Sequence, residues 1–247
     1  MSFTEINVTA DGGVTTLTLN RPQALNAITP IMLKEAKQAV DVAGADTNIR
    51  AIVVTGEGRA FSAGVDLKAL NDVKLEAGAV GGVLDIPARD LINAIRTVPK
   101  PVIAKVNGFC FTGALELALA CDLFFVAEEA KLGDTHAKWG LRPTWGMSAR
   151  LPATVGIAKA KELSFTARTF KGADAAAMGI ANRAVPAAEL DAAVDAVLAE
   201  ILANSGDSIA AYKTLYNEGV AATVQQSVQF EERRRFIMEE TMDGLEE

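Results

Sequence analysis

Several residue types are scarce in this 247-residue chain, and each scarcity excludes a class of protein. The two cysteines, Cys110 and Cys121, are too few for a disulfide scaffold, and both lie in apolar stretches where a free thiol packs as a small hydrophobic group. Basic residues are also few: 24 lysines and arginines against 31 acids give a net charge of −7, which repels nucleic acid. No stretch approaches the roughly 18 uninterrupted apolar residues of a transmembrane helix. We therefore expect a protein of a reducing compartment that binds neither nucleic acid nor membrane.

The N-terminal sequence MSFTEINVT lacks the basic segment and the apolar core of a secretion signal, so we expect a cytoplasmic protein. What the chain has in plenty is apolar residues. They make up 50% of the sequence against 22% charged residues, the balance of a globular protein with a substantial core.

The apolar patterning predicts an α/β fold. Alternation over 3–9 and 14–20, around the turn Asp11-Gly12-Gly13, predicts a β-hairpin. Continuous apolar runs are typical of strands buried on both faces, and three of them, with helical patterns between them, predict parallel strands. The predicted strands are 49–55, 101–106 and 122–127, and the predicted helices are about 30–43, 87–97 and 113–120. The glycine-rich segment 72–86 predicts a connecting loop, and the Ala-rich remainder predicts helices near 146–152, 156–166, 173–178, 187–204, 206–221 and 224–242.

Two glycine-bearing loops follow buried strands and lead into helices. The first, 56–70, has Phe61 where a dinucleotide fingerprint needs its third glycine, and it lacks the Lys-Ser/Thr of a phosphate loop. The second places Gly113 at a helix start and Glu116 three residues on, so a peptide N–H and a carboxylate face one spot. Either Glu116 merely complements the helix dipole, or this acid within an apolar run has a chemical function.

These loops resemble a known family. AFSAGVD (60–66) and NGFCFTGALELALACDL (107–123) are similar to the two oxyanion-loop motifs of the enoyl-CoA hydratase/isomerase, or crotonase, superfamily, and segments 18–28, 99–108 and 151–163 agree in order along the chain. The resemblance implies a crotonase-like α/β fold, a spiral of ββα repeats with a C-terminal helical oligomerisation region. It places the acyl-CoA site in a core over 1–190 and assigns 191–247 to packing into homotrimers, or hexamers built as dimers of trimers.

The resemblance also implies the site. Ala63 and Gly113 supply the two N–H groups of an oxyanion hole for the thioester carbonyl, on which the reaction places negative charge. The stretch Ala63 to Asp66 lies along the CoA moiety, and Ala24 to Ala27 lies near its adenine end. The implied contacts with the CoA thioester are Ala24, Ala27, Ala63, Gly64, Val65, Asp66, Leu67 and Gly113. Coenzyme A belongs to the substrate, and neither a metal nor a separate cofactor is implied.

The acid pair departs from the family pattern. Hydratases of the family usually carry two glutamates around one water molecule; Glu116 matches the first, but the position of the second holds His136, the one histidine of the chain. We expect Glu116 to act as base toward water and His136 to orient that water or deliver the α-proton, with Asp134 as a reserve acid. The alternative is that His136 hydrogen-bonds locally and the second acid is lost.

A second departure lies at 141–151, which keeps the family's Pro-x-x-Gly spacing in Pro143 and Gly146. Thr144 and Trp145 stand where small residues are common. Trp145 either shapes the acyl end of the pocket or packs in the core, the commoner fate of a tryptophan.

The leading functional prediction is a lyase of fatty-acid metabolism that hydrates 2-enoyl-CoA thioesters to 3-hydroxyacyl-CoA. A second is an enoyl-CoA isomerase, or another crotonase chemistry, in which one base moves a proton between carbons. A third is a non-catalytic acyl-CoA binding protein that has kept the oxyanion loops and lost the acid pair.

Overall fold

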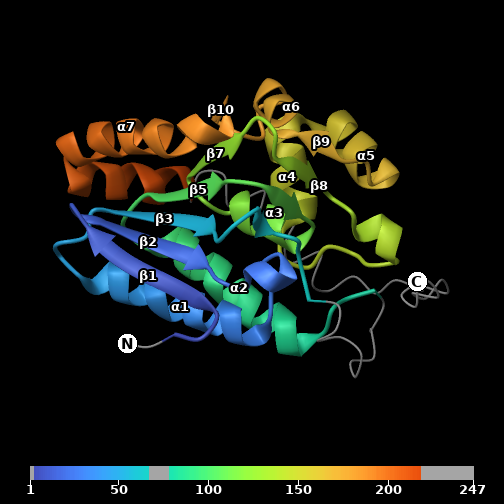
Figure 1. The fold of residues 1–247 in the computed structure, drawn as a ribbon, viewed down its shortest axis with the longest axis horizontal. Coiled ribbons are helices and arrows are strands. Elements are labelled where there is room, and N and C mark those ends of the chain that lie inside the picture. The colour runs from blue at the N-terminus through green and yellow to red at the C-terminus, as the bar shows by residue number, and fades with distance from the viewer. Residues whose placement is uncertain (1–2, 67–77, 218–247) are drawn as a thin grey trace.

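The computed structural model describes residues 3–66 and 78–217, and its strands form two sheets (Figure 1). The larger sheet has the order β1-β2-β3-β5-β7-β10, and every neighbouring pair except β1 and β2 is parallel. Its strands are β1 (Ile6–Asp11), β2 (Val14–Leu19), β3 (Ala51–Gly56), β5 (Val102–Val106), β7 (Leu123–Ala127) and β10 (Arg183–Val185). The predicted hairpin and the three predicted buried strands are thus confirmed. Gly12 and Gly13 close the hairpin with φ of +54° and +84°, as a two-residue turn of this hand requires.

The smaller sheet, of order β4-β6-β8-β9, consists of strands that the sequence did not predict. They are β4 (Ala60–Ser62), β6 (Phe109–Phe111), β8 (Lys131–Gly133) and β9 (Phe170–Lys171). The first three run parallel, and each follows a strand of the larger sheet within a few residues. Gly108 allows one such crossing, because a Cβ there would lie 2.1 Å from the carbonyl oxygen of Arg59. Strands of three residues are too short to show a period in the sequence.

Helices follow these strand pairs and complete the spiral. They are α1 (Pro30–Ala45), α2 (Gly82–Thr97), α3 (Gly113–Ala118), α4 (Met147–Val155), α5 (Ile157–Thr166), α6 (Gly172–Ala177) and α7 (Leu190–Ala203), with 3-10 turns η1 (Pro22–Ala24), η3 (His136–Trp139) and η4 (Ala187–Glu189). A further helix covers 206–217. The loop predicted over 72–86 is wrong for its last five residues, where α2 begins at Gly82 despite the internal Pro87. The helix predicted over 224–242 lies outside the described residues.

Helices cover the larger sheet. Figure 1 shows α1 and α2 packed together on one side and α7 on the other, where α7 contacts β3, β7 and β10. Leu190, Val194 and Leu198 of α7 belong to the same hydrophobic core as the strands. The boundary at 190 and the subunit packing assigned to 191–247 stay predictions.

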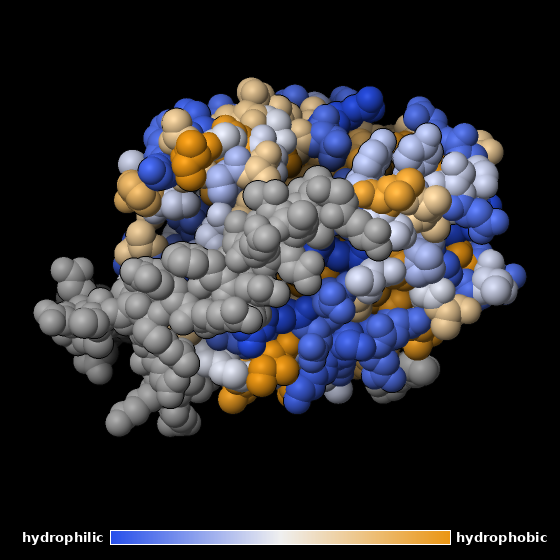
Figure 2. All heavy atoms as spheres, turned by 180° about the vertical axis from the view of Figure 1, so that it is seen from behind, coloured by the Kyte–Doolittle hydropathy of each residue, from blue (hydrophilic) through white to orange (hydrophobic). Residues whose placement is uncertain are grey.

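The surface mixes polar and apolar residues. On the face drawn in Figure 2, hydrophilic side chains surround smaller groups of hydrophobic ones. Phe165 and Ile157 of α5 are among the exposed large apolar side chains. Within the described ranges, no helix has the length and apolarity needed to span a bilayer.

Candidate active site

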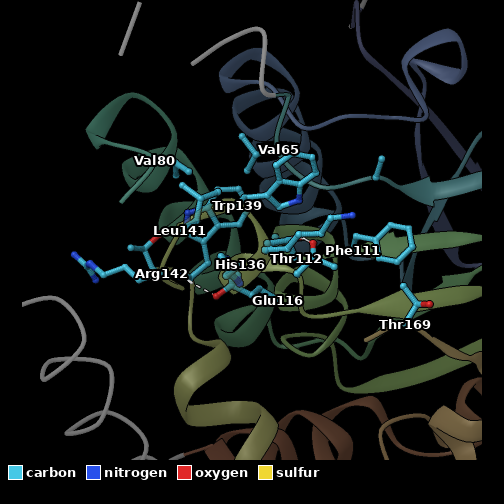
Figure 3. Close-up of a pocket in the computed structure, with 16 residues that line it drawn as sticks. Val65, Val80, Phe111, Thr112, Glu116, His136, Trp139, Leu141, Arg142 and Thr169 are labelled. Carbon is cyan, nitrogen blue, oxygen red and sulfur yellow. Dashed lines mark hydrogen bonds and ion pairs between the residues drawn. The ribbon is translucent and has the colours of Figure 1, made fainter. Parts of the chain in front are cut away.

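A cavity of about 260 Å³ opens where the ends of three parallel strands of the smaller sheet meet the first turn of α3 (Figure 3). Parallel strands end at the same edge of a sheet, so the loops after β4, β6 and β8 converge there although they are distant in sequence. The cavity is lined by Ala63, Val65, Val80, Phe111, Thr112, Gly113, Glu116, Thr135, His136, Lys138, Trp139, Leu141, Arg142, Thr144, Trp145 and Thr169. The fold therefore brings together all four residues predicted to carry the chemistry.

Glu116 presents a buried carboxylate to this cavity, with 1% of its surface exposed. Its Oε1 accepts hydrogen bonds from the peptide N–H groups of Trp145, at 3.0 Å, and Met147, at 2.9 Å. Two peptide N–H groups at the start of α4 thus offset much of the cost of burying the charge. The other oxygen, Oε2, lies 3.6 Å from Nε2 of His136. Glu116 therefore does more than complement the dipole of its own helix.

His136 is the first residue of η3, and its ring lies between the carboxylates of two acids. Its Nδ1 lies 2.6 Å from Oδ1 of Asp134, while Nε2 faces Glu116. Because a carboxylate only accepts, Nδ1 carries the proton, and Nε2 is the nitrogen that exchanges one. His136 thus hydrogen-bonds locally and still presents a titratable nitrogen to Glu116.

Asp134 lies behind His136 rather than in the cavity wall, and it is 3% exposed. Its Oδ2 accepts a hydrogen bond of 2.6 Å from the hydroxyl of Ser164 on α5. Burial alone raises the pKa of Asp134, but the hydrogen bond and charge of His136, with the bond from Ser164, outweigh burial and hold the pKa below its usual range. Asp134 is thus placed as an ionised partner of His136, not as the reserve acid expected from the sequence.

The chain enters α3 through a strained residue. Thr112 has φ +54° and ψ −114°, a conformation that costs a β-branched residue about 1–3 kcal/mol and that turns the chain abruptly from β6 into the helix. Its hydroxyl bonds that of Thr135 at 2.7 Å. Gly113 is then the first residue of α3, so its N–H has no acceptor within the helix.

The second predicted oxyanion donor, the N–H of Ala63, is engaged by the fold. It donates to the carbonyl oxygen of Leu25 at 2.9 Å, contrary to the expectation that it faces a ligand. Two residues further along, Val65 forms a parallel bridge with Ile28. The two hydrogen bonds of this bridge join Ile28 to the carbonyl group before Val65 and to the N–H group after it. The N–H of Val65 itself therefore faces away from Ile28. Gly64, at φ +96°, causes the change of peptide direction that separates Ala63 from Val65.

Among the described residues, the other predicted contacts, Ala24, Ala27, Gly64 and Asp66, do not line the cavity. Arg21 connects them: its Nη1 donates to the carbonyl oxygen of Ala27 at 2.6 Å and to Oδ2 of Asp66 at 2.9 Å. Ala24 lies in the neighbouring turn η1. The structure thus places the segments 24–27 and 63–66 side by side, while Leu67 lies outside the described residues.

Asp85 is a site residue that the sequence analysis missed. It lies in the first turn of α2, is 6% exposed, and its Oδ1 accepts hydrogen bonds from Nε1 of Trp145, at 2.9 Å, and the hydroxyl of Thr144, at 2.7 Å. An acid in a first helical turn is a common pattern, so nothing local indicates that this one bonds two residues of the cavity wall. Within the described ranges, no cluster of histidine, cysteine or carboxylate side chains is arranged to hold a metal ion.

Fold and site together define a class of protein: an α/β spiral of paired strands whose loops enclose a buried carboxylate beside a helix start. The model of the family "Enoyl-CoA hydratase/isomerase" matches residues 9–243. The "Probable enoyl-CoA hydratase 1, peroxisomal" of Arabidopsis thaliana is 32% identical over 223 residues, 90% of this chain and 82% of that protein. The "Short-chain-enoyl-CoA hydratase" of Clostridium acetobutylicum is 30% identical over 232 residues, 94% of this chain and 88% of that protein.

A crystal structure of enoyl-CoA hydratase from Mycobacterium avium matches the fold with a TM-score of 0.80 at 35% identity, covering 92% of this chain and 94% of that chain. The chain therefore belongs to the enoyl-CoA hydratase/isomerase family and has the crotonase fold, as the sequence predicted. The family implies an acyl-CoA substrate.

Proposed function

We propose that the protein adds water across the double bond of 2-enoyl-CoA thioesters and releases 3-hydroxyacyl-CoA. The observation that carries this proposal is the pair formed by Oε2 of Glu116 and Nε2 of His136, 3.6 Å apart in the cavity. That separation exceeds a direct hydrogen bond, so one water molecule or one substrate proton can contact both atoms. The relatives above are named as hydratases, which supports the same reaction class.

In this proposal the thioester oxygen is held by the N–H groups of Gly113 and Val65. Gly113 offers the N–H at the start of α3, and Val65 lines the cavity with its N–H turned away from the bridge to Ile28. Val65 takes the role expected of Ala63, whose N–H is bonded to Leu25. Negative charge develops on this oxygen during the reaction, and one such donor is worth about 3–4 kcal/mol.

The proposed reaction is balanced in atoms and charge. The water oxygen bonds to C3 while Glu116 accepts the proton that water loses, and the π electrons of the double bond move onto C2 and the thioester oxygen. Glu116 passes this proton to the unprotonated Nε2 of His136, and the ionised Asp134 stabilises the imidazolium that forms. Nε2 then delivers the proton to C2, and the enolate collapses to the thioester. One water is consumed, and the site returns to its starting state.

We place the CoA moiety along the joined segments 24–27 and 63–66, with Leu67 as the next contact predicted from the sequence. This placement is supported by the bridge between Ile28 and Val65, which puts both segments beside the cavity.

An enoyl-CoA isomerase is the second candidate, and one observation favours it. Among the described residues that line the cavity, Glu116 is the one carboxylate. A single base that moves a proton between C2 and C4 needs no second carboxylate. A non-catalytic binding protein is less well supported, because binding alone does not require the buried side chains of Asp134, His136 and Glu116 to contact one another in sequence.

The test is the loss of conjugated enoyl-thioester absorbance when the purified protein meets crotonyl-CoA. Glu116→Gln is expected to lower kcat about 10³-fold, since it removes the base, and to change the Kd for butyryl-CoA by less than about threefold. Glu162→Gln, on the outer surface of α5, is the matched control and is expected to keep full activity.

Three other outcomes contradict the proposal. Full activity in Glu116→Gln rejects Glu116 as the base. Conversion of 3-enoyl to 2-enoyl thioesters without water uptake establishes the isomerase. Tight binding of acyl-CoA without turnover of any thioester establishes the binding protein.

A further inference from the structure

We propose that Trp145, fixed in position by Asp85, is the wall that restricts the site to short acyl groups. This inference rests on the proposed function in one respect: it takes the thioester carbonyl to lie at the N–H of Gly113.

Trp145 is held at its ring and at both of its peptide groups. Its indole Nε1 donates to Oδ1 of Asp85 at 2.9 Å, its N–H donates to Glu116 at 3.0 Å, and its carbonyl oxygen accepts from Nη1 of Arg150 at 2.8 Å. The side chain is 4% exposed. Moving the ring away would leave buried polar groups unpaired, which is unfavourable for each group. The wall is therefore rigid.

The ring lies at the point from which the acyl chain must extend. A Cβ built on Gly113 would lie 2.4 Å from Cζ3 and 2.9 Å from Cε3 of Trp145. A carbonyl held at the N–H of Gly113 thus has the indole within van der Waals reach of its first acyl carbons. Only a short chain fits between the carbonyl and the ring.

The volume of the cavity agrees with a short acyl group. At about 260 Å³ it lies below the roughly 300–1,000 Å³ of pockets that enclose drug-sized ligands.

The second tryptophan of the chain provides a matched control. Trp139 also lines the cavity, but it is half-buried and the ammonium of Lys138 lies 5.5 Å from its ring centroid. Trp139 therefore lines the solvent side of the cavity, where truncation widens the entrance without lengthening the acyl site.

The experiment measures the Kd of butyryl-, hexanoyl- and octanoyl-CoA by calorimetry, so that no turnover is needed. The wild-type protein is expected to bind octanoyl-CoA no more tightly than butyryl-CoA. In Trp145→Ala the ratio of octanoyl to butyryl affinity is expected to rise at least about tenfold, because each methylene newly buried is worth up to about fourfold. Trp145→Leu is expected to give an intermediate rise, and Trp139→Ala a ratio within about twofold of wild type.

Asp85 is tested as a positioning residue by two further variants. Asp85→Ala frees the indole and is expected to raise the ratio of octanoyl to butyryl affinity, whereas Asp85→Asn keeps an acceptor at Oδ1 and is expected to retain the wild-type ratio. Melting temperatures show which variants are folded; if Trp145→Ala fails to fold, Trp145→Leu carries the test.

Hydration of crotonyl-CoA and 2-octenoyl-CoA by the same variants separates this inference from the proposed function. If the affinity ratio shifts but no variant hydrates either thioester, Trp145 limits the acyl length and the proposed hydratase activity is rejected. If the wild-type protein hydrates both lengths equally, the hydratase activity stands and the role of Trp145 is rejected. An unchanged ratio in both Trp145 variants, or an equal rise in Trp139→Ala, also overturns it.

Discussion

The indole ring of Trp145 lies directly over Gly113, so closely that any side chain at position 113 would overlap it. The start of α3 and the wall of the cavity therefore fit together as one unit. This contact explains why a bulky residue and a glycine occur together at the centre of the site.

The contact predicts a compensating pair of substitutions. Gly113→Ala is expected to lower the free energy of unfolding by about 2–3 kcal/mol, because the added Cβ forces the buried ring or the helix to shift. In the Trp145→Ala background the same change is expected to cost less than about 1 kcal/mol. A double-mutant cycle in urea measures the coupling; additive effects of the two substitutions would show that the contact carries no energy.

His136→Gln is expected to lower the hydration of crotonyl-CoA about 100-fold or more, because an amide can hydrogen-bond water but cannot exchange a proton. The Kd for butyryl-CoA is expected to stay within about threefold of wild type. The measurement is steady-state kinetics beside calorimetry, with Lys131→Gln, an exposed cation of β8 that does not line the cavity, as the control. Unchanged kcat in His136→Gln would assign both proton transfers to Glu116.

Asp134 makes stability depend on pH in a definite direction. Its pKa in the folded protein is lower than the ordinary value of about 3.9, so its contribution is fully present above that value and is lost as the pH falls through the folded-state pKa. Asp134→Asn is expected to be less stable than wild type by about 1–3 kcal/mol at pH 7, with the difference shrinking below about pH 4.

Unfolding in urea at a series of pH values measures this difference. Glu200→Gln, an exposed acid on α7, is the control. The difference in the free energy of unfolding between Asp134→Asn and wild type should shrink at low pH. If it stayed constant down to about pH 2.5, roughly one unit below the ordinary pKa, the assignment would be contradicted.

An ion pair with a buried cation joins the helix over 206–217 to the start of β7 in the larger sheet. Lys213 donates to Oδ2 of Asp122 at 2.7 Å and to the carbonyl oxygens of Ile95 and Lys100. Burial lowers the pKa of Lys213 and raises that of Asp122, although each partner opposes the shift of the other.

Removing one partner of this pair is expected to destabilise the protein more than removing both. Asp122→Ala is expected to cost about 3 kcal/mol, since the ammonium of Lys213 stays buried without its counter-charge. The double variant Asp122→Ala/Lys213→Met is expected to cost less than Asp122→Ala alone, because no unpaired charge then stays buried. Thermal and urea unfolding check both values; a double variant as costly as the sum would show that the two groups act independently.

The parts of the fold that could be predicted are those that neighbouring residues in the sequence determine. The Asp11-Gly12-Gly13 turn sets the hairpin, and Thr29, whose hydroxyl accepts from the N–H of Met32, begins α1 where the sequence placed it. The short strands of the smaller sheet and the first turn of α2 could not be predicted. A three-residue strand has no period, and a helix that contains Pro87 contradicts the local propensity of its own segment.

The sequence by itself determined which chemical groups are present and which motifs hold them: Glu116 three residues after Gly113, and His136 in place of a second acid. The tertiary structure decided what those groups do. The orientation of a peptide N–H depends on the backbone dihedral angles at Gly64 and on a bridge to Ile28, so Val65 rather than Ala63 is turned away from that bridge. The partner of Trp145 is an aspartate 60 positions away, and the loops that hold the site meet only because parallel strands end at one edge of a sheet. Contacts between segments this distant follow from packing of the whole chain, which no local pattern encodes.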